Sequence, residues 1–465
     1  MAQATSPARQ FARSWVVMGG LYFGSTALGF LVGVILARFL GAADYGAYAL
    51  AMTTATLAGL VTEFGLPTLA MREVGMARSS GAWGEVRGLL RWADRTILAL
   101  SALVMLSFYL WHDLFAADRP SAFLHALLWG VALVPVVALG KLRALVLLAL
   151  DRVFASQFPM MILRAALFIA GCLALRATGI HLTATVAMAL QVGAAGAATI
   201  IAIILFLRYR PAPLASAVPR YAVRRWLSSC LPMGMTEGLR LLQGQMALLL
   251  VGALSGSLAA AGIYRVADAV TQMTMLVVSV AATAATPLFA RLHGEGDREG
   301  IERLAVLAVI INVGGMLLLG LPVALGGHWL LPRVFGAEFE ASLEPFVILW
   351  LGGVVVTSLG LVLTLANMIG RHIYATQAFG VIAAVNLVLG ALLIPSLGNT
   401  GAALASVCAS FTGTAFCAVR LYRSEGINAT LFNPSGLRLA MSTLAETATR
   451  LAGRIGSSKI MDRHK

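Results

Sequence analysis

The chain has 465 residues, of which 59% are hydrophobic and only 12% are charged, and its mean hydropathy is +0.87. A soluble domain carries about 25% charged residues, so this composition excludes a soluble globular protein and indicates a membrane protein with many helical spans. The net charge of +14 would suit a nucleic-acid-binding protein, but an excess of basic residues on the cytoplasmic side of a membrane protein is the favoured explanation. We therefore expect the lipid bilayer, and no nucleic acid, as a partner.

Apolar segments of roughly 20 residues or more recur along the whole chain and predict transmembrane helices. Regular alternation of polar and apolar residues is absent, which argues against a transmembrane barrel. The predicted fold class is an all-α polytopic membrane protein. Its twelve predicted spans are 14–38, 45–66, 96–115, 122–150, 158–177, 182–207, 227–254, 258–289, 304–331, 344–369, 374–395 and 399–422.

The distribution of basic residues predicts the orientation in the membrane. If the N-terminus and alternate loops face the cytoplasm, that side holds 27 of the 34 lysines and arginines. The opposite side holds four, namely Arg38, Arg119, Arg176 and Arg333. The positive-inside rule then places both termini in the cytoplasm.

A sequence pattern near the second span recurs in the second half of the chain. The sequence YGAY at 45–48 opens the second span, and AGIY at 261–264 opens the eighth, so that Gly262 follows Gly46 by 216 residues. A repeat of this length built on helix pairs predicts two similar halves, and six spans per half make the repeats parallel. The predicted organisation is a six-helix bundle at 1–207, a cytoplasmic linker at 208–226, a second six-helix bundle at 227–423 and a basic cytoplasmic tail at 424–465. Within the tail, 436–456 is expected to form an interfacial helix, with a loosely ordered tail as the alternative.

Ionisable side chains inside the spans are the candidates for function, because they are costly at membrane depth and usually face the bundle interior or a wet cavity. Two neighbouring spans each carry such side chains on or near one helical face. These are Glu237, Arg240 and Gln243 in the seventh span, and Arg265, Asp268 and Gln272 in the eighth. Two interpretations are open: local ion pairs that hold the packing, or a partly cationic vestibule whose arginines bind an anionic headgroup through bidentate hydrogen bonds.

Three further basic residues join the candidate substrate-binding set. Arg164, in the fifth span, has no acidic partner in its own span, so it either contacts a ligand or pairs with another helix. Lys141 and Arg143 are expected near the cytoplasmic mouth of the bundle, where they either extend toward water or bind a phosphate. The carboxylates Glu63, Glu237 and Asp268 are the candidates for coupling transport to an ion gradient.

No catalytic constellation is present in the sequence. There is no GxxxxGK[ST] phosphate-binding loop, no HExxH, no CxxC and no convincing Ser/His/Asp set. We therefore expect no enzyme activity, no metal site and no cofactor, although a proton or sodium gradient remains a possible driving force.

The motifs around the second span resemble those of the bacterial polysaccharide-biosynthesis flippases. These are the O-antigen and exopolysaccharide (Wzx-type) members of the multidrug/oligosaccharidyl-lipid/polysaccharide (MOP) exporter superfamily. The resemblance rests on ILARFLGAADYGAY at 35–48, FGL at 64–66 with Arg72, GIY at 262–264, PLFAR at 287–291 and VFGAEF at 334–339, and it covers most of 10–425.

The resemblance implies a MATE-like fold with two bundles around a central cavity. It implies transport of undecaprenyl-diphosphate-linked oligosaccharide from the inner to the outer leaflet of the bacterial cytoplasmic membrane, by ion-coupled alternating access, in the company of other polysaccharide-assembly proteins. Two alternatives are kept. A multidrug exporter of the same superfamily is disfavoured because the intramembrane carboxylates are matched by arginines, and a membrane glycosyltransferase or polymerase is disfavoured because the external loops are short.

Overall fold

The structure is a computed structural model that describes residues 7–115 and 121–431. Over these ranges the chain is almost entirely helical, as the composition predicts. Among the described helices, eight are long and apolar enough to cross a membrane, and the bent pair α10–α11 raises this number to nine. The protein is therefore a multi-pass membrane protein.

Two of these helices are too long to cross a bilayer only once. α1 (Pro7–Glu63) has 57 residues and α15 (His372–Glu425) has 54, or about 80 Å at 1.5 Å per residue, against a hydrocarbon core of about 30 Å. Each is kinked at a glycine with positive φ, Gly41 (73°) and Gly398 (56°), a conformation that other residues adopt only at a cost. Each helix therefore corresponds to two consecutive predicted spans.

No loop separates the first two predicted spans, 14–38 and 45–66, because the chain bends at Gly41 alone and is helical again from Ala42. The backbone N–H of Ala42 donates to the carboxylate of Glu338 at 2.7 Å. This bond satisfies one of the N–H groups that a helix leaves without an intrahelical partner at its start, so the second half of α1 needs no loop residues to begin.

The remaining predicted spans coincide with helices or short series of helices. The count of twelve and the cytoplasmic placement of both termini stay predictions. The predicted interfacial helix at 436–456 lies outside the described residues.

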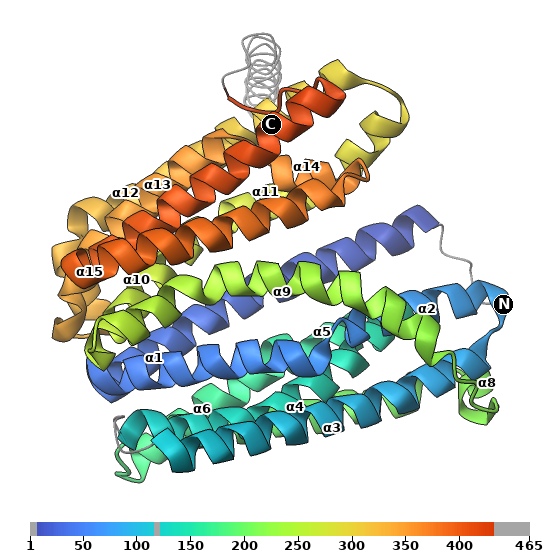
Figure 1. The fold of residues 1–465 in the computed structure, drawn as a ribbon, viewed down its shortest axis with the longest axis horizontal. Helices are drawn as coiled ribbons and strands as arrows, with labels where there is room; N and C mark the ends of the chain where they lie inside the picture. The colour runs from blue at the N-terminus through green and yellow to red at the C-terminus, as the bar shows by residue number, and fades with distance from the viewer. Residues whose placement is uncertain (1–6, 116–120, 432–465) are drawn as a thin grey trace, which may run out of the picture. The chain divides into compact units, whose positions relative to one another are not determined.

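By its contacts the chain divides into two compact units. Unit 1 consists of Met1–Val270, Gly327–Pro345 and Gly390–Ala402. After α1 it contains, wholly or for the most part, α2 (Leu66–Ser80), α3 (Trp83–Phe115), α4 (Ser121–Ala149), α5 (Val153–Phe158), the π-helix η2 (Pro159–Leu163), α6 (Arg164–Ala177), α7 (Ala184–Tyr209), α8 (Ala212–Ser216), α9 (Val223–Leu254) and α10 (Leu258–Thr274). Within it α4 packs against α1, α2, α3 and α7, and Figure 1 shows α3 and α4 side by side.

The segment predicted as a linker, 208–226, belongs to unit 1 and is hydrogen-bonded to it. The backbone N–H of Arg220 donates to the carbonyl of Gly84 at 2.9 Å, and Arg87 of α3 donates to the carbonyl of Ala217 at 2.6 Å. At the start of α9, Arg225 pairs with Glu85 and Glu73. The repeat boundary predicted at this segment stays a prediction. The segment itself is hydrogen-bonded to α3.

The two copies of the repeated glycine motif cross each other inside unit 1. A Cβ added to Gly46 would overlap the carbonyl oxygen of Leu258 and lie 2.8 Å from the nitrogen of Gly262. A Cβ added to Gly262 would overlap the carbonyl oxygen of Ala42 and lie 3.1 Å from the nitrogen of Gly46. The second half of α1 and the start of α10 therefore touch backbone to backbone, and we call this contact the glycine crossing.

The end of α12 (Arg298–Phe335) and the short 3-10 helix η3 (Ala337–Ser342) that follows it secure the kink of α1 beside this crossing. Arg38 donates to the carbonyls of Arg333 and Val334, the latter at 2.7 Å, and so caps the last turn of α12. The ring of Phe339 stands edge-on to that of Tyr45, with centroids 6.1 Å apart. The 334–339 motif thus holds the end of α12 and the kink of α1 together.

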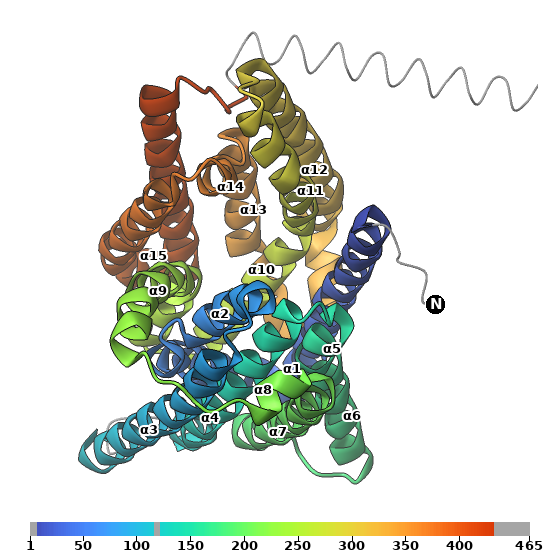
Figure 2. The same ribbon diagram turned by 90° about the vertical axis from the view of Figure 1, so that its right-hand side faces the viewer.

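Unit 2 consists of Thr271–Gly326, Phe346–Leu389 and Ala403–Lys465. It contains α11 (Leu276–Gly294), α14 (Val362–Met368) and most of α12 (Arg298–Phe335), α13 (Leu343–Ser358) and α15. Its core joins Phe289, Ile301, Leu365 and Leu421, and Figure 2 shows α14 lying among α11, α12 and α15. The indole N–H of Trp350 donates to the carbonyl of Met316 at 2.9 Å.

Candidate functional site

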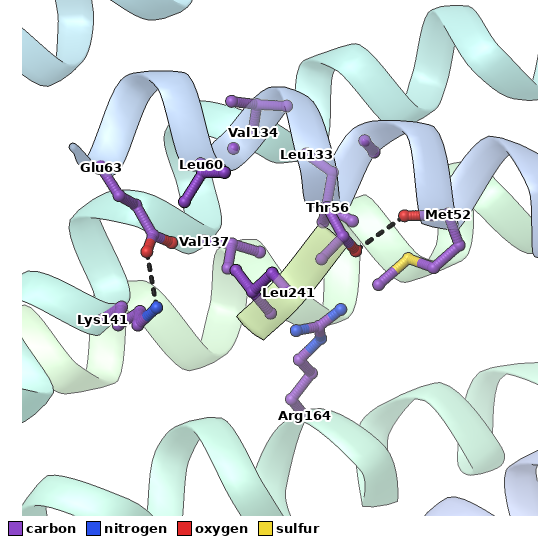
Figure 3. A pocket seen from close by; sticks show the side chains of 12 residues that line it. Met52, Thr56, Leu60, Glu63, Leu133, Val134, Val137, Lys141, Arg164 and Leu241 are labelled. Carbon is purple, nitrogen blue, oxygen red and sulfur yellow. Dashed lines mark hydrogen bonds and ion pairs between the residues drawn. The ribbon is translucent and has the colours of Figure 1, made fainter. Parts of the chain in front are cut away.

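Unit 1 encloses a cavity of about 210 Å³ that carries charged side chains in an otherwise mostly apolar wall. We call it the polar cavity. Its walls come from the second half of α1, from α4, from the first residue of α6 and from α9 (Figure 3). Small-molecule pockets typically measure about 300–1,000 Å³, so this one suits a small charged group rather than a whole oligosaccharide. Its lining residues are Met52, Ala55, Thr56, Gly59, Leu60, Glu63, Leu133, Val134, Val137, Lys141, Arg164 and Leu241.

Arg164 reaches the polar cavity from an irregular stretch of helix. The preceding residues, Pro159–Leu163, form one turn of π-helix, a local widening that is frequent at functional sites. In Figure 3 the side chain of Arg164 extends from its helix toward Leu241 and Thr56. The candidate that the sequence singles out for its missing partner is thus a cavity-lining residue.

The partner of Arg164 is a neutral amide. With its amide oxygen facing the guanidinium, Gln191 of α7 accepts from Nε at 3.0 Å and from Nη2 at 2.5 Å. Gln191 is 8% exposed. None of the carboxylates in the described part of the chain forms an ion pair with Arg164, so its positive charge is not neutralised by a neighbour.

The second cation of the polar cavity, Lys141, is neutralised. Its ammonium lies 2.6 Å from Oε2 of Glu63, as Figure 3 shows. The side chain of Glu63 is 12% exposed and that of Lys141 is 37% exposed, so the carboxylate is the more deeply buried member. The cavity therefore holds two positive charges and one negative charge.

Arg143, two residues after Lys141 on α4, belongs to a different contact. Its Nη2 lies 2.7 Å from a carboxylate oxygen of Asp94 on α3, and its guanidinium lies over the ring of Phe206 at 5.1 Å. Its Nε and Nη1 are buried without a hydrogen-bond partner in the structure. The residue joins α3, α4 and α7 and does not line the polar cavity.

The two intramembrane stripes predicted from the sequence form ion pairs within their own helices. Arg240 pairs with Glu237 at 2.7 Å on α9, and Arg265 pairs with Asp268 at 2.8 Å on α10. This is the geometry of the local-pair interpretation, although all four side chains keep between 28% and 53% of their surface exposed. These four residues do not line the polar cavity, and neither do Gln243 and Gln272. Their role in binding or coupling stays a prediction.

Reasoning from sequence missed the partners of two candidate residues. Gln191 is a polar residue in an otherwise apolar span, a signal that could have been read but that carries no charge. Asp94 lies just before the predicted span 96–115, and only the folded bundle brings it to Arg143. Each contact joins two different helices, α6 with α7 and α3 with α4, and periodicity within one helix cannot reveal it.

The Lys141–Glu63 pair gives a testable expectation about stability. Lys141→Met leaves a mostly buried carboxylate without a partner, which costs about 3 kcal/mol in well-buried pairs and less here because the lysine is partly exposed. Lys141→Met should therefore lower the melting temperature of the purified protein. Adding Glu63→Gln should restore most of the loss, because the double variant has no unpaired charge. A double variant that melts below Lys141→Met would contradict this account of the pair.

The family model described as polysaccharide biosynthesis protein matches residues 11–293 of the chain. A search of curated protein sequences gives no match.

The fold has counterparts among solved structures. A lipid II flippase, MurJ, in an inward closed conformation superposes with a TM-score of 0.67 at 14% identity, covering 92% of this chain and 91% of that chain. An inward-facing multidrug resistance MATE family transporter of the MOP superfamily superposes with a TM-score of 0.67 at 13% identity, covering 86% of this chain and 96% of that chain. A MATE transporter of Vibrio cholerae superposes with a TM-score of 0.59 at 18% identity, covering 90% of this chain and 97% of that chain.

These likenesses show that the fold is the MATE-like fold that the resemblance implies. Since the family model spans more than half of the chain, the protein belongs to the polysaccharide biosynthesis protein family.

Proposed function

We propose that the protein is a flippase that moves an undecaprenyl-diphosphate-linked oligosaccharide, an O-antigen or exopolysaccharide repeat unit, from the inner to the outer leaflet of the bacterial cytoplasmic membrane. Family membership supports polysaccharide assembly as the process. The similar solved structures, a lipid II flippase, a multidrug resistance MATE family transporter and a further MATE transporter, support transport as the kind of activity.

The observation that carries the proposal is the charge of the polar cavity. Arg164 brings a positive charge into an apolar wall without an acidic neighbour, while Lys141 is balanced by Glu63. An unbalanced cation is costly inside a membrane protein, and a bound anion relieves that cost. Arginine suits a diphosphate because its planar guanidinium donates parallel hydrogen bonds to two oxygens. In this proposal the lipid chain stays in the bilayer while the diphosphate and the glycan cross the membrane.

Coupling to an ion gradient is the less direct part of the proposal. Glu63 is the best placed of the three carboxylate candidates, since it alone lines the polar cavity. A cation from the gradient that binds Glu63 would compete with Lys141 for the carboxylate, which would link ion binding to binding of the anion. Glu237 and Asp268 are held by arginines of their own helices. Transport that continues at full rate in vesicles after an ionophore collapses the gradient would contradict coupling.

The test of the proposed function is complementation of a bacterial host that lacks its own repeat-unit flippase. Expression of the full chain is expected to restore surface polysaccharide for at least one glycan, while the empty vector does not. If no glycan among several is exported although the protein reaches the membrane, the proposal fails. If the same cells accumulate less of a cationic drug, a multidrug exporter replaces it.

A further inference from the structure

We propose that Gln191 determines the charge selectivity of the polar cavity, by holding Arg164 in place without neutralising it. The inference rests on the proposed function and names the ligand chemistry of that site: a group that carries negative charge, such as a diphosphate. It assigns a role to a residue on α7 that does not itself line the cavity.

The hydrogen bonds of Arg164 show what Gln191 contributes. A guanidinium has five N–H donors, and the Gln191 oxygen accepts from Nε and from one N–H of Nη2. The other three N–H groups have no acceptor among the described residues. Gln191 therefore occupies one edge of the guanidinium, and the remaining donors are left for a ligand.

The chemical type of the acceptor then decides the sign of the cavity. Glutamate has the same length as glutamine and could accept the same two hydrogen bonds, but it would add a negative charge beside Arg164. The cavity would change from one net positive charge to none, in surroundings where charges interact far more strongly than in water. With glutamine at this position, the arginine makes the two hydrogen bonds of an ion pair. Its positive charge stays available to a ligand.

A purely structural role for Gln191 makes the opposite prediction. If Gln191 only satisfied the donors of a buried arginine, glutamate would do so at least as well, because hydrogen bonds between charged groups are stronger. Methionine has a similar volume, but its sulfur is a weak hydrogen-bond acceptor. It would therefore satisfy the donors of Arg164 worst. The two roles therefore predict opposite orders for the variants Gln191→Glu and Gln191→Met in their affinity for a diphosphate.

The experiment compares equilibrium binding of radiolabelled farnesyl diphosphate and of farnesol to the full-length purified protein. Wild type is expected to prefer the diphosphate. Gln191→Glu should lower affinity for farnesyl diphosphate tenfold or more while leaving farnesol binding unchanged, and Gln191→Met should lower it less. The matched control Gln377→Glu makes the same chemical change at an exposed position of α15 and should bind both ligands like wild type.

The reverse ranking, with Gln191→Met weaker than Gln191→Glu, overturns the inference, as does a wild type without preference for the diphosphate. If Gln191→Glu does not reach the membrane, Arg164→Gln makes the same change in net charge while leaving two amides in contact. It must abolish the preference for the diphosphate, and a preference that survives it overturns the inference. Failure of the proposed function has a separate signature: farnesyl diphosphate binds with the expected ranking, but wild type exports no glycan in the flippase-deficient host.

Discussion

Replacement of Gly262 by alanine is expected to abolish export and to lower the melting temperature of the protein, and replacement of Gly46 is expected to do the same. The reason is the glycine crossing, where an added methyl group meets main-chain carbonyls of the opposing helix, the Leu258 oxygen for Gly46 and the Ala42 oxygen for Gly262. A backbone atom cannot move aside as the end of a flexible side chain can. The two helices must therefore separate, and overpacking of this kind costs about 1–3 kcal/mol.

The matched control lies in α1, the helix of Gly46. Gly29 has no atom within 4 Å of an added Cβ, and alanine favours a helix over glycine by roughly 1 kcal/mol. Gly29→Ala should therefore export normally and melt at the wild-type temperature or above. The measurements are melting of the purified variants and surface polysaccharide at equal membrane levels. Normal export by Gly262→Ala with an unchanged melting temperature would show that the crossing is not required.

The second large effect is expected at Arg164. Arg164→Ala removes the unneutralised positive charge of the polar cavity, and we expect export to fall at least tenfold. Arg164→Lys keeps the charge but loses the planar, bidentate donor geometry, so it should recover only part of the activity. Surface polysaccharide is measured in the flippase-deficient host at matched membrane levels.

Arg240→Ala is the comparison that separates this role from a general need for arginine in the bundle. Arg240 also lies in a predicted span, 227–254, but it is paired with Glu237 on its own helix and does not line the polar cavity. We expect a smaller loss than for Arg164→Ala. Equal export by wild type and Arg164→Ala would contradict a ligand-binding role for Arg164 and leave it a structural residue.

Much of the fold follows from the sequence because membrane helices are specified locally. A run of apolar residues satisfies its own backbone hydrogen bonds in lipid only as a helix, so the helical segments could be predicted from composition and length. The glycine repeat was also visible, as the 216-residue spacing of Gly46 and Gly262. Their contact was not, since nothing in either segment encodes which helix it crosses.

The candidate site was predicted only in part, for the same reason. Charge at membrane depth identified Arg164 as a residue in need of a partner, and the structure places it in the polar cavity. The cost argument could not show that Arg240 and Arg265 are balanced within their helices while Arg164 is not, because i, i+3 spacing permits a pair without requiring one. Gln191 escaped notice because it is uncharged, although it holds Arg164.

The most direct test of the central claim is transport by the purified protein in liposomes. An undecaprenyl-diphosphate-linked oligosaccharide is placed in one leaflet, and its arrival in the other is followed with a glycosidase that acts only on that side. We predict protein-dependent transfer by wild type and its loss with Arg164→Gln. If the lipid stays in its original leaflet while the reconstituted wild-type protein remains folded, this protein is not a flippase for such lipids.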